Sequence, residues 1–395
     1  FTENKYVVLE SLEPGIYPGD AIVSIDGLTT GQWEDSLRPY ISAGNSSIFR
    51  RQISETILGR QSIHTPETVV IEDSLGANHT FTLFADSTRY SVYYRKRYYP
   101  ADSLVNIKYT GMNCDVGYVN MGNLRISDVN PMYFSFKEKS AIIFDLRNYP
   151  NNTAWSLGDL LLPNRTAFAR DMEPDIYYPG TYYWYDDSIG QNGNPISYKG
   201  HVIVLINEQT QSQAEYTTMM LRSMPNVTVI GSQTAGADGN ITYWRISQDI
   251  FAGITSLGVF YPNGDSTQRI GIVPDSFVYP TRAGIRHHDD EVLNKALQMA
   301  CTAASVPEIT NHYASVSVYP NPAKAMLNVE VKNMSAPVIE LTISDITGRQ
   351  LVHRSARHNA GNSVQTFSIG QLAAGMYYIT VVADGQQYVT KFVKE

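Results

Sequence analysis

Short apolar runs alternate with amphipathic stretches through the middle of this chain. The runs have the length and the β-branched content of buried strands. We expect strands at 105–109, 116–121, 141–145 and 201–206. Apolar residues at helical spacing predict helices over 132–140 and 155–162. Strands that alternate with helices indicate an α/β core built on a largely parallel sheet.

From Ala314 onward the apolar residues recur with a period of two, which is typical of half-buried antiparallel strands. We expect strands within 316–322, 327–331, 339–348 and 375–382, with turns at 345–348 and 384–385. About 80 residues with this pattern predict a small antiparallel β-sandwich over 314–395. The preceding residues 302–313, small and interrupted by Pro307, are typical of a linker.

Residues 4–27 carry a third pattern, a short strand at Val7–Leu9 followed by a Gly-rich turn. The turn reads Gly15-Ile-Tyr17-Pro-Gly-Asp and resembles the carboxylate-binding turn of a PDZ domain. The resemblance implies a PDZ-like β domain over 1–88. It also implies that Gly15, Ile16 and Tyr17 bind the C-terminus of a peptide by strand addition.

Ser212 is the most informative single residue, because it lies between a strand and a helix. Strand 201–206 leads into a polar turn, and Ser212 then opens a helix over 213–223. A hydroxyl there lies at the positive end of a helix dipole, beside backbone N–H groups without partners. Such a place can hold a nucleophile together with its oxyanion donors. The alternative is that Ser212 only caps the helix.

Four segments around this serine resemble the core of the tail-specific, or C-terminal-processing, serine peptidases of family S41. In chain order they are Ile142–Asn148, Ser212–Glu215, Val227–Gly236 and Gly271–Asp275. The resemblance implies a crotonase/ClpP-like α/β peptidase core over 89–301 with Ser212 as the nucleophile. It also implies backbone oxyanion donors at Gln213 and near Tyr149, although the family has glycines where this chain reads Tyr-Pro-Asn.

The chain departs from the family at the position of the catalytic base. The position 25 residues after Ser212, where the best-known branch has a lysine base, holds Ala237, and the next family position holds Ile241. A serine–lysine dyad is therefore excluded. A tricorn-like branch uses Ser–His–Glu, but none of the eight histidines matches its upstream segment. Because Phe1 is not an initiator methionine, we expect a signal and an upstream region, and the general base with them, outside this sequence.

The acidic residues near these motifs have structural alternatives. We expect Glu215 to accept a hydrogen bond from the Ser212 backbone N–H as in a capping box, rather than to act in acid–base catalysis. Asp145 and Arg147 are expected to form a structural ion pair. Asp265, the only acid where the family would place its orienting residue, lies in a turn pattern. The run 286–291 is more typical of an N-capped helix than of a metal site.

The length and composition limit the number of domains and the kinds of partner that this chain can have. The 395 residues suffice for two or three domains. A net charge of −8 argues against nucleic-acid binding, and no apolar run approaches the ~18 residues of a membrane span. Cys114 and Cys301 fit either a disulfide or two buried thiols. There is no CxxC motif, and we expect neither a metal nor a cofactor.

The 27 tyrosines form two clusters, Arg89–Tyr99 and Tyr177–Tyr185. Each could be a platform for a peptide or a carbohydrate, or simply a set of strand-forming tyrosines. We favour the strand interpretation for the first cluster. For the second, which could flank the cleft, both interpretations stay open.

The C-terminal region carries V-Y-P-N-P, D-I-T-G-R, L-x-x-G-M-Y-x-I and K-F-V-K in order over 314–395. This order closely resembles the C-terminal sorting domain of the Bacteroidetes type IX secretion system, with a plain immunoglobulin-like adhesion module as the alternative. The resemblance implies the type IX machinery as a partner and a chain that is secreted or attached to the outer-membrane surface. Our main hypothesis is a secreted serine endopeptidase with a non-lysine base. A peptide-binding pseudopeptidase is the alternative, and a carbohydrate-binding module is a distant third.

Overall fold

The computed structural model describes residues 1–58, 65–84, 104–108, 114–302, 315–334, 337–345, 349–357, 361–383 and 386–395. It divides into two compact units, Phe1–Ser305 and Val306–Glu395. The Arg89–Tyr99 cluster, nearly all of the expected linker and most of the expected turns at 345–348 and 384–385 lie outside the described residues.

The first unit begins with a small antiparallel sheet in the order β1-β2-β4-β5, in which β3 also pairs with β2. The strands are β1 (Tyr6–Val7), β2 (Ala21–Ile25), β3 (Leu28–Thr29), β4 (Pro66–Glu72) and β5 (Asn78–Phe84). The sheet is accompanied by α1 (Thr30–Leu37), the 3₁₀ turn η1 (Arg38–Tyr40) and α2 (Ser46–Thr56). Phe49 and Ile53 of α2 share an apolar core with Ile25 and Val69 of the sheet. We call residues 1–84 the N-terminal module.

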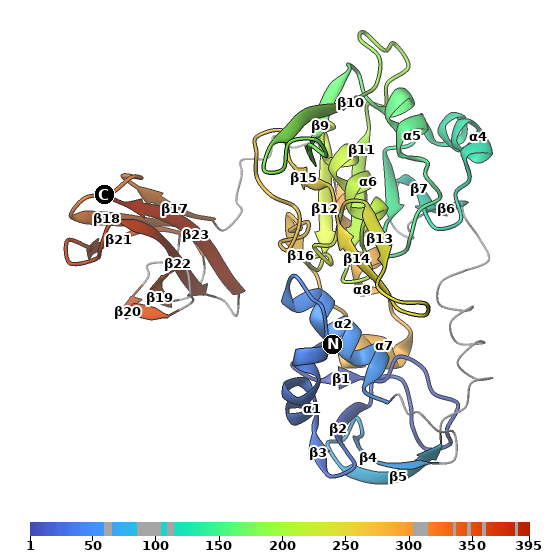
Figure 1. The fold of residues 1–395 in the computed structure, drawn as a ribbon, viewed down its shortest axis with the longest axis vertical. Coiled ribbons are helices and arrows are strands. Elements are labelled where there is room, and N and C mark those ends of the chain that lie inside the picture. Colours follow the sequence, from blue (N-terminus) through green and yellow to red (C-terminus); the bar gives the residue numbers. More distant parts are fainter. Residues whose placement is uncertain are drawn as a thin grey trace. The chain divides into compact units, whose positions relative to one another are not determined.

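A six-stranded sheet forms the centre of the first unit, in the order β16-β12-β11-β8-β7-β6 (Figure 1). The strands are β6 (Leu104–Lys108), β7 (Asp115–Asn120), β8 (Ala141–Asp145), β11 (His201–Ile206), β12 (Val227–Gly231) and β16 (Ser276–Phe277). All neighbours are parallel except β6 and β7. The predicted α/β core with a largely parallel sheet is confirmed.

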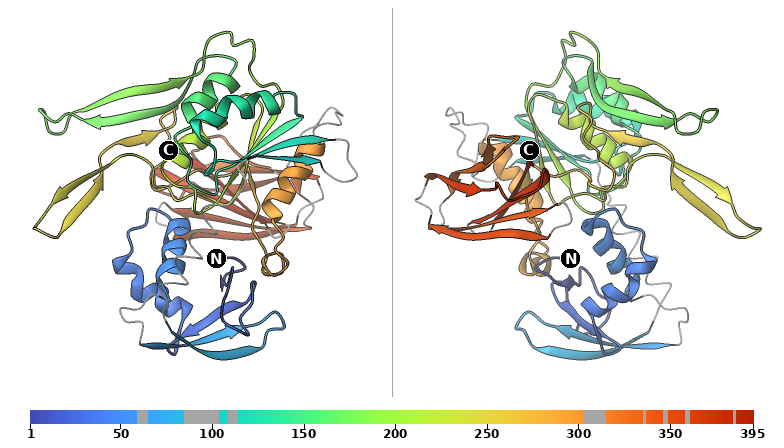
Figure 2. Two further views of the ribbon diagram at one scale, coloured as in Figure 1. Left: turned by 90° about the vertical axis from the view of Figure 1, so that its right-hand side faces the viewer. Right: turned by 60° about the vertical axis from the view of Figure 1, so that its left-hand side comes forward.

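Helices cover both faces of this sheet, with α8 on the face opposite to α6 (Figure 2). The helices of the core are α4 (Ile126–Phe136), α5 (Ala154–Leu161), α6 (Gln213–Arg222), α7 (Arg282–His287) and α8 (Glu291–Thr302). Val202, Val204 and Ile206 of β11 pack with the α4–α5–α6 side, while Ile203 and Leu205 pack with α8. Because both faces are buried, the strand is apolar throughout instead of alternating.

The prediction of a helix at 132–140 placed this helix too late in the sequence. α4 begins at Ile126, passes through Pro131 and ends at Phe136. Its buried residues Val129, Met132, Tyr133 and Phe136 recur at helical spacing, so the signal starts before the proline. Residues 137–140 instead turn the chain into the sheet, where the Ser140 N–H donates to the Asp115 carbonyl (3.2 Å).

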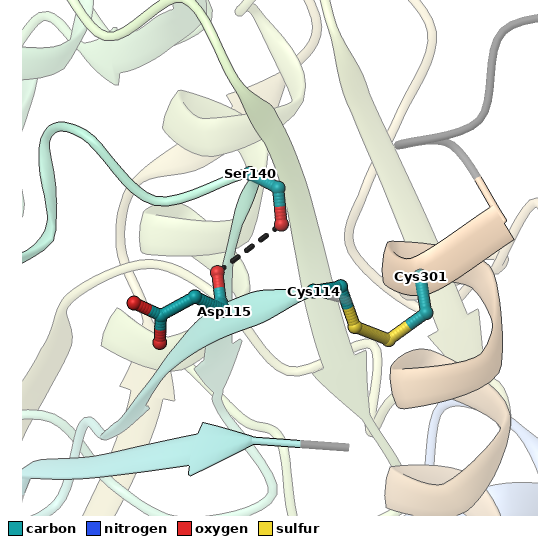
Figure 3. The surroundings of a disulfide bond; sticks show 4 residues. All are labelled: Cys114, Asp115, Ser140 and Cys301. Carbon is teal, nitrogen blue, oxygen red and sulfur yellow. Dashed lines mark hydrogen bonds between the residues drawn. A yellow bond between two sulfur atoms is a disulfide. The ribbon is translucent and has the colours of Figure 1, made fainter. Parts of the chain in front are cut away.

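Cys114 and Cys301 form a disulfide, which decides between the two sequence alternatives. Cys114 precedes β7, and Cys301 lies in the last turn of α8 (Figure 3). Their Cα atoms are 5.4 Å apart across a separation of 187 residues. The bond therefore fastens α8 to the sheet, and its presence suits an oxidising compartment.

Two β-ribbons extend from the core on one side (Figure 2). One consists of β9 (Thr166–Pro174) and β10 (Tyr182–Ile189), with β15 (Gly258–Phe260) added to β9. The other consists of β13 (Ile241–Arg245) and β14 (Phe251–Thr255). The Tyr177–Tyr185 cluster spans the tip of the first ribbon, where Tyr177 is 81% exposed. Four of its aromatic residues lie in strand β10, and all four are exposed.

The second unit is an antiparallel sandwich. Its sheets have the orders β17-β18-β21 and β20-β19-β22-β23. The strands are β17 (Ser315–Tyr319), β18 (Met326–Met334), β19 (Val338–Asp345), β20 (Gln350–Arg357), β21 (Gly361–Ser368), β22 (Gly375–Ala383) and β23 (Gln386–Lys394). Alternate residues such as Leu327, Val329, Ile339, Leu341 and Ile379 form its core. The predicted antiparallel sheets are confirmed.

Candidate active site

Ser212 lies in a tight turn at the carboxyl end of the central strand β11. The turn is anchored by Thr210, whose hydroxyl donates to the Leu146 carbonyl (2.7 Å) and accepts from the Asn207 N–H (3.0 Å). Thr210 is fully buried, so the turn is fastened to the segment that follows β8. Ser212 is thereby presented where the strand ends and α6 begins.

The backbone of Ser212 is strained. Its φ of 54° and ψ of −122° lie in a region that residues with a side chain rarely adopt, at a cost of about 1–3 kcal/mol. Such strain persists only where the surroundings fix the chain, and it concentrates at functional sites. A serine in a strained strand-to-helix turn is the arrangement known as a nucleophile elbow, which exposes the hydroxyl above the sheet.

Glu215 holds this turn in place from the first turn of α6. Its side chain is 0% exposed and accepts four hydrogen bonds. One oxygen accepts from the backbone N–H groups of Ser212 (3.1 Å) and Ala237 (3.0 Å). The other accepts from the Gly236 N–H (2.8 Å) and the Thr234 hydroxyl. Burial raises the pKa of Glu215, while the four donors oppose that rise. Its contacts are those of a structural residue.

The segment after β8 forms the second wall of the site. The Tyr149 hydroxyl lies 3.5 Å from Ser212 Oγ, and the Gln213 side-chain amide donates to Asn152 Oδ1 (2.9 Å). Tyr149 is 58% exposed, so its phenol reaches the serine from the solvent side. Gln213 occupies the first helical position, where backbone N–H groups have no partner within the helix. The sequence pointed to a backbone donor near Tyr149, and the structure adds the phenol.

Asp145 and Arg147 form the predicted ion pair, with Arg147 Nη2 2.6 Å from Asp145 Oδ2. The same nitrogen lies 2.7 Å from Asp290 Oδ2. Asp290 Oδ1 in turn accepts from the Leu293 N–H (3.0 Å) at the start of α8. Asp145 therefore stabilises the turn that follows β8, and its side chain does not contact Ser212. The N-capped helix favoured over a metal site for 286–291 is also present.

No histidine or lysine among the described residues forms a hydrogen bond with Ser212. The described histidines are His79, His201, His287, His288 and His353. His79 pairs with Asp73 (2.8 Å) and His201 with Thr228 (2.9 Å). Burial lowers the pKa of His201, which lies at the opposite end of β11 from the serine. The described part of the chain does not supply a base of the Ser–His or Ser–Lys type.

A buried acid next to Ala237 was missed at the sequence level. Asp238 is 5% exposed, and burial raises its pKa to about 8. One carboxylate oxygen accepts from the Gly239 N–H (2.8 Å), while the other is buried without a hydrogen-bond partner. Asp171, whose pKa burial raises to about 7, adds to the shift of Asp238. By contrast, Asp265 lies in an exposed turn, as predicted.

Asp238→Asn is expected to increase stability selectively at high pH. The pKa of Asp238 in the folded chain, about 8, exceeds its ordinary value of 3.8, so folding retains a proton that the unfolded chain releases. Stability from this group is fully present below pH 4 and is lost as the pH rises towards 8. Asparagine stays neutral, so the variant should gain on the order of 3 kcal/mol at pH 9 and little at pH 4. Urea unfolding at both pH values, with Asp265→Asn as the control, measures this. An equal change at both pH values would refute it.

The residues predicted to bind the C-terminus of a peptide lie in the N-terminal module, away from Ser212. In the turn at 15–20, the Ile16 N–H donates to the Glu13 carbonyl (3.3 Å) and the Tyr17 N–H to Asp20 (2.8 Å). Gly15 lies against the Phe81 ring. A peptide carboxylate could bind these two N–H groups only by displacing their present partners.

A cavity of about 320 Å³ at the carboxyl edge of the core sheet is lined by Arg147, Glu208 and Ser232, among others, but not by Ser212.

Comparison with known proteins identifies two regions. Residues 115–278 match the model of peptidase family S41, and residues 317–395 match that of the secretion system C-terminal sorting domain. This chain therefore carries a serine-type peptidase domain of family S41, followed by a type IX sorting domain. The sorting domain indicates that the chain is secreted or attached to the cell surface. No described helix is long and apolar enough to cross a membrane.

Two solved structures of CPAF show the same fold at low identity. Mature CPAF complexed with lactacystin is 14% identical, with a TM-score of 0.60, over 76% of this chain and 80% of that one. Mature CPAF is 13% identical, with a TM-score of 0.59, over the same shares. A putative peptidase from Parabacteroides merdae is 18% identical, with a TM-score of 0.46, over 55% of this chain and 71% of that one. No curated protein matches the chain.

Proposed function

We propose that this chain is a secreted endopeptidase of the tail-specific type in which Ser212 attacks the peptide carbonyl. The observation that carries the proposal is the backbone strain at Ser212, which the four hydrogen bonds of buried Glu215 fix at the N-terminus of α6. A capping serine has ordinary extended backbone angles and does not need such support. The strain therefore favours a nucleophile over a simple cap.

In the proposed reaction, Ser212 Oγ bonds to the carbonyl carbon and negative charge develops on the carbonyl oxygen. The Gln213 N–H and the Tyr149 hydroxyl, both next to the serine, are the proposed donors to that oxygen. The positive end of α6 adds to this stabilisation. No described histidine or lysine is hydrogen-bonded to Ser212 and Ala237 cannot accept a proton, so the base that takes the hydroxyl proton is proposed to lie outside the described residues.

The N-terminal module is the proposed PDZ-like reader of a substrate's C-terminal tail. Among the described strands its sheet ends in β1 and β5, and such an edge suits strand addition by a peptide. The turn at Gly15, Ile16 and Tyr17 stays the proposed carboxylate site. Residues 314–395 are the proposed contact for the type IX secretion machinery.

A catalytically inactive peptide-binding pseudopeptidase is the second candidate, favoured by the lack of a base near Ser212 among the described residues. The two candidates differ when the secreted protein is incubated with an unfolded protein and the products are analysed by mass spectrometry. An endopeptidase produces new termini, and prior treatment with a fluorophosphonate prevents them. Intact substrate that co-purifies with the protein would instead support the pseudopeptidase.

A further inference from the structure

Asn45 links the N-terminal module to the part of the core that holds Ser212. Its side-chain oxygen caps α2 by accepting from the Ile48 N–H (3.0 Å). Its side-chain nitrogen donates to the carbonyls of Thr234 and Ile270, both at 2.9 Å. α2 lies on the side of the module that faces the core (Figure 1). One amide therefore caps a helix of the module and binds two loops of the core.

The loop that contains Thr234, to which Asn45 donates, also forms hydrogen bonds with Glu215. Thr234 and Gly236 both donate to the Glu215 carboxylate, which accepts from the Ser212 N–H. A continuous path of hydrogen bonds thus runs from Asn45 through Thr234 and Glu215 to Ser212. Such a path transmits position because each step is a short, directional hydrogen bond, part-buried at its two ends and fully buried between Thr234 and Glu215.

A second contact from α2 reaches the turn on the other side of the serine. Arg51 Nη1 donates to the Glu208 carbonyl (3.2 Å), within the turn that precedes Ser212. Arg51 lies six residues after Asn45 on the same helix. α2 therefore touches both segments that fix Ser212, the turn before it and the loop behind it.

The junction has little free space. A Cβ on Gly236 would lie 2.8 Å from Asn45 Nδ2 and 2.9 Å from the Arg269 carbonyl carbon. A Cβ on Gly44 would lie 2.8 Å from Arg269 Cα. The backbones of Gly44 and Gly236 therefore approach the neighbouring loop closely, so a shift of the start of α2 towards the core would press on the loop that holds Glu215.

We propose that Asn45 is a positioning residue, which makes the geometry of Ser212 depend on the seating of the N-terminal module. The catalytic part of the inference rests on the proposed role of Ser212. Asparagine suits the task because its amide supplies one acceptor for the cap and two donors for the carbonyls. Serine can cap α2 but cannot replace the two donors.

Asn45→Ser therefore separates the two roles. We expect kcat for peptide cleavage to fall about 10- to 100-fold with KM within about threefold, because the nucleophile is misplaced while the substrate site is kept. Thr29→Ala is the matched control. It removes the capping box of α1 in the same module, where Thr29 has no hydrogen bond to the core. Cleavage by this control should stay within about twofold of the wild type.

Hydrogen–deuterium exchange of the full chain tests the coupling without requiring activity. Peptides covering 208–218 and 232–240 should exchange faster in Asn45→Ser than in the wild type, and should not change in Thr29→Ala. Unchanged exchange in both peptides, or unchanged kcat, would overturn the inference. If the wild type cleaves nothing while exchange still rises in Asn45→Ser, the peptidase proposal fails and the structural coupling stands.

Discussion

Replacing Ser212 with alanine is expected to lower the rate of peptide cleavage at least about 10³-fold. The variant lacks the only hydroxyl that the strained turn presents at the N-terminus of α6. The measurement is kcat/KM on an unfolded protein or a fluorogenic peptide. Ser223→Ala is the matched control, because Ser223 ends the same helix with an ordinary φ of −73°. Cleavage by Ser223→Ala should remain near that of the wild type.

Ser212→Gly checks that the loss arises from the hydroxyl rather than from misfolding. Glycine adopts a positive φ without a Cβ clash, so this variant should lose the same activity and melt no lower than Ser212→Ala. Cleavage within tenfold of the wild type by either variant would contradict Ser212 as the nucleophile.

Replacing Glu215 with alanine is expected to lower the free energy of unfolding by about 3–5 kcal/mol. The substitution leaves buried donors from Ser212, Thr234, Gly236 and Ala237 without their acceptor. Cleavage should be lost as well, because nothing then holds the strained turn. Denaturant unfolding at neutral pH measures the stability change.

Glu215→Gln is the matched variant for this prediction. It keeps the shape and one accepting oxygen but turns an amide nitrogen towards two of the donors. We expect its stability to lie between those of the wild type and Glu215→Ala. A loss below about 1 kcal/mol in Glu215→Ala would show that the four hydrogen bonds do not support the turn.

The strands of the core were predictable because strands buried on both faces are apolar throughout their length, as in Ala141–Asp145 and His201–Ile206. The helix at Ile126–Phe136 was placed too late because its buried spacing runs through Pro131. Three strands of the sandwich, Gln350–Arg357, Gly361–Ser368 and Gln386–Lys394, were not among the predicted runs. Each of them carries many polar residues, so its apolar signal is weak.

The part of the site that sequence could predict is local. Ser212 and Glu215 are three residues apart, and that spacing alone predicts their contact. The Tyr149 phenol, the buried Asp238 and the Asn45 link arise from segments that only the fold brings together. The same is true of the disulfide, which spans 187 residues. None of these leaves a periodic or spaced pattern in the sequence.

The role of Ser212 as the nucleophile of a peptidase is tested most directly by treating the secreted full-length protein with a fluorophosphonate and mapping the adduct by tandem mass spectrometry. We expect one modified residue, Ser212, and no adduct after denaturation, because the reactivity depends on the strained turn. No adduct, or an adduct on another serine, would contradict the claim.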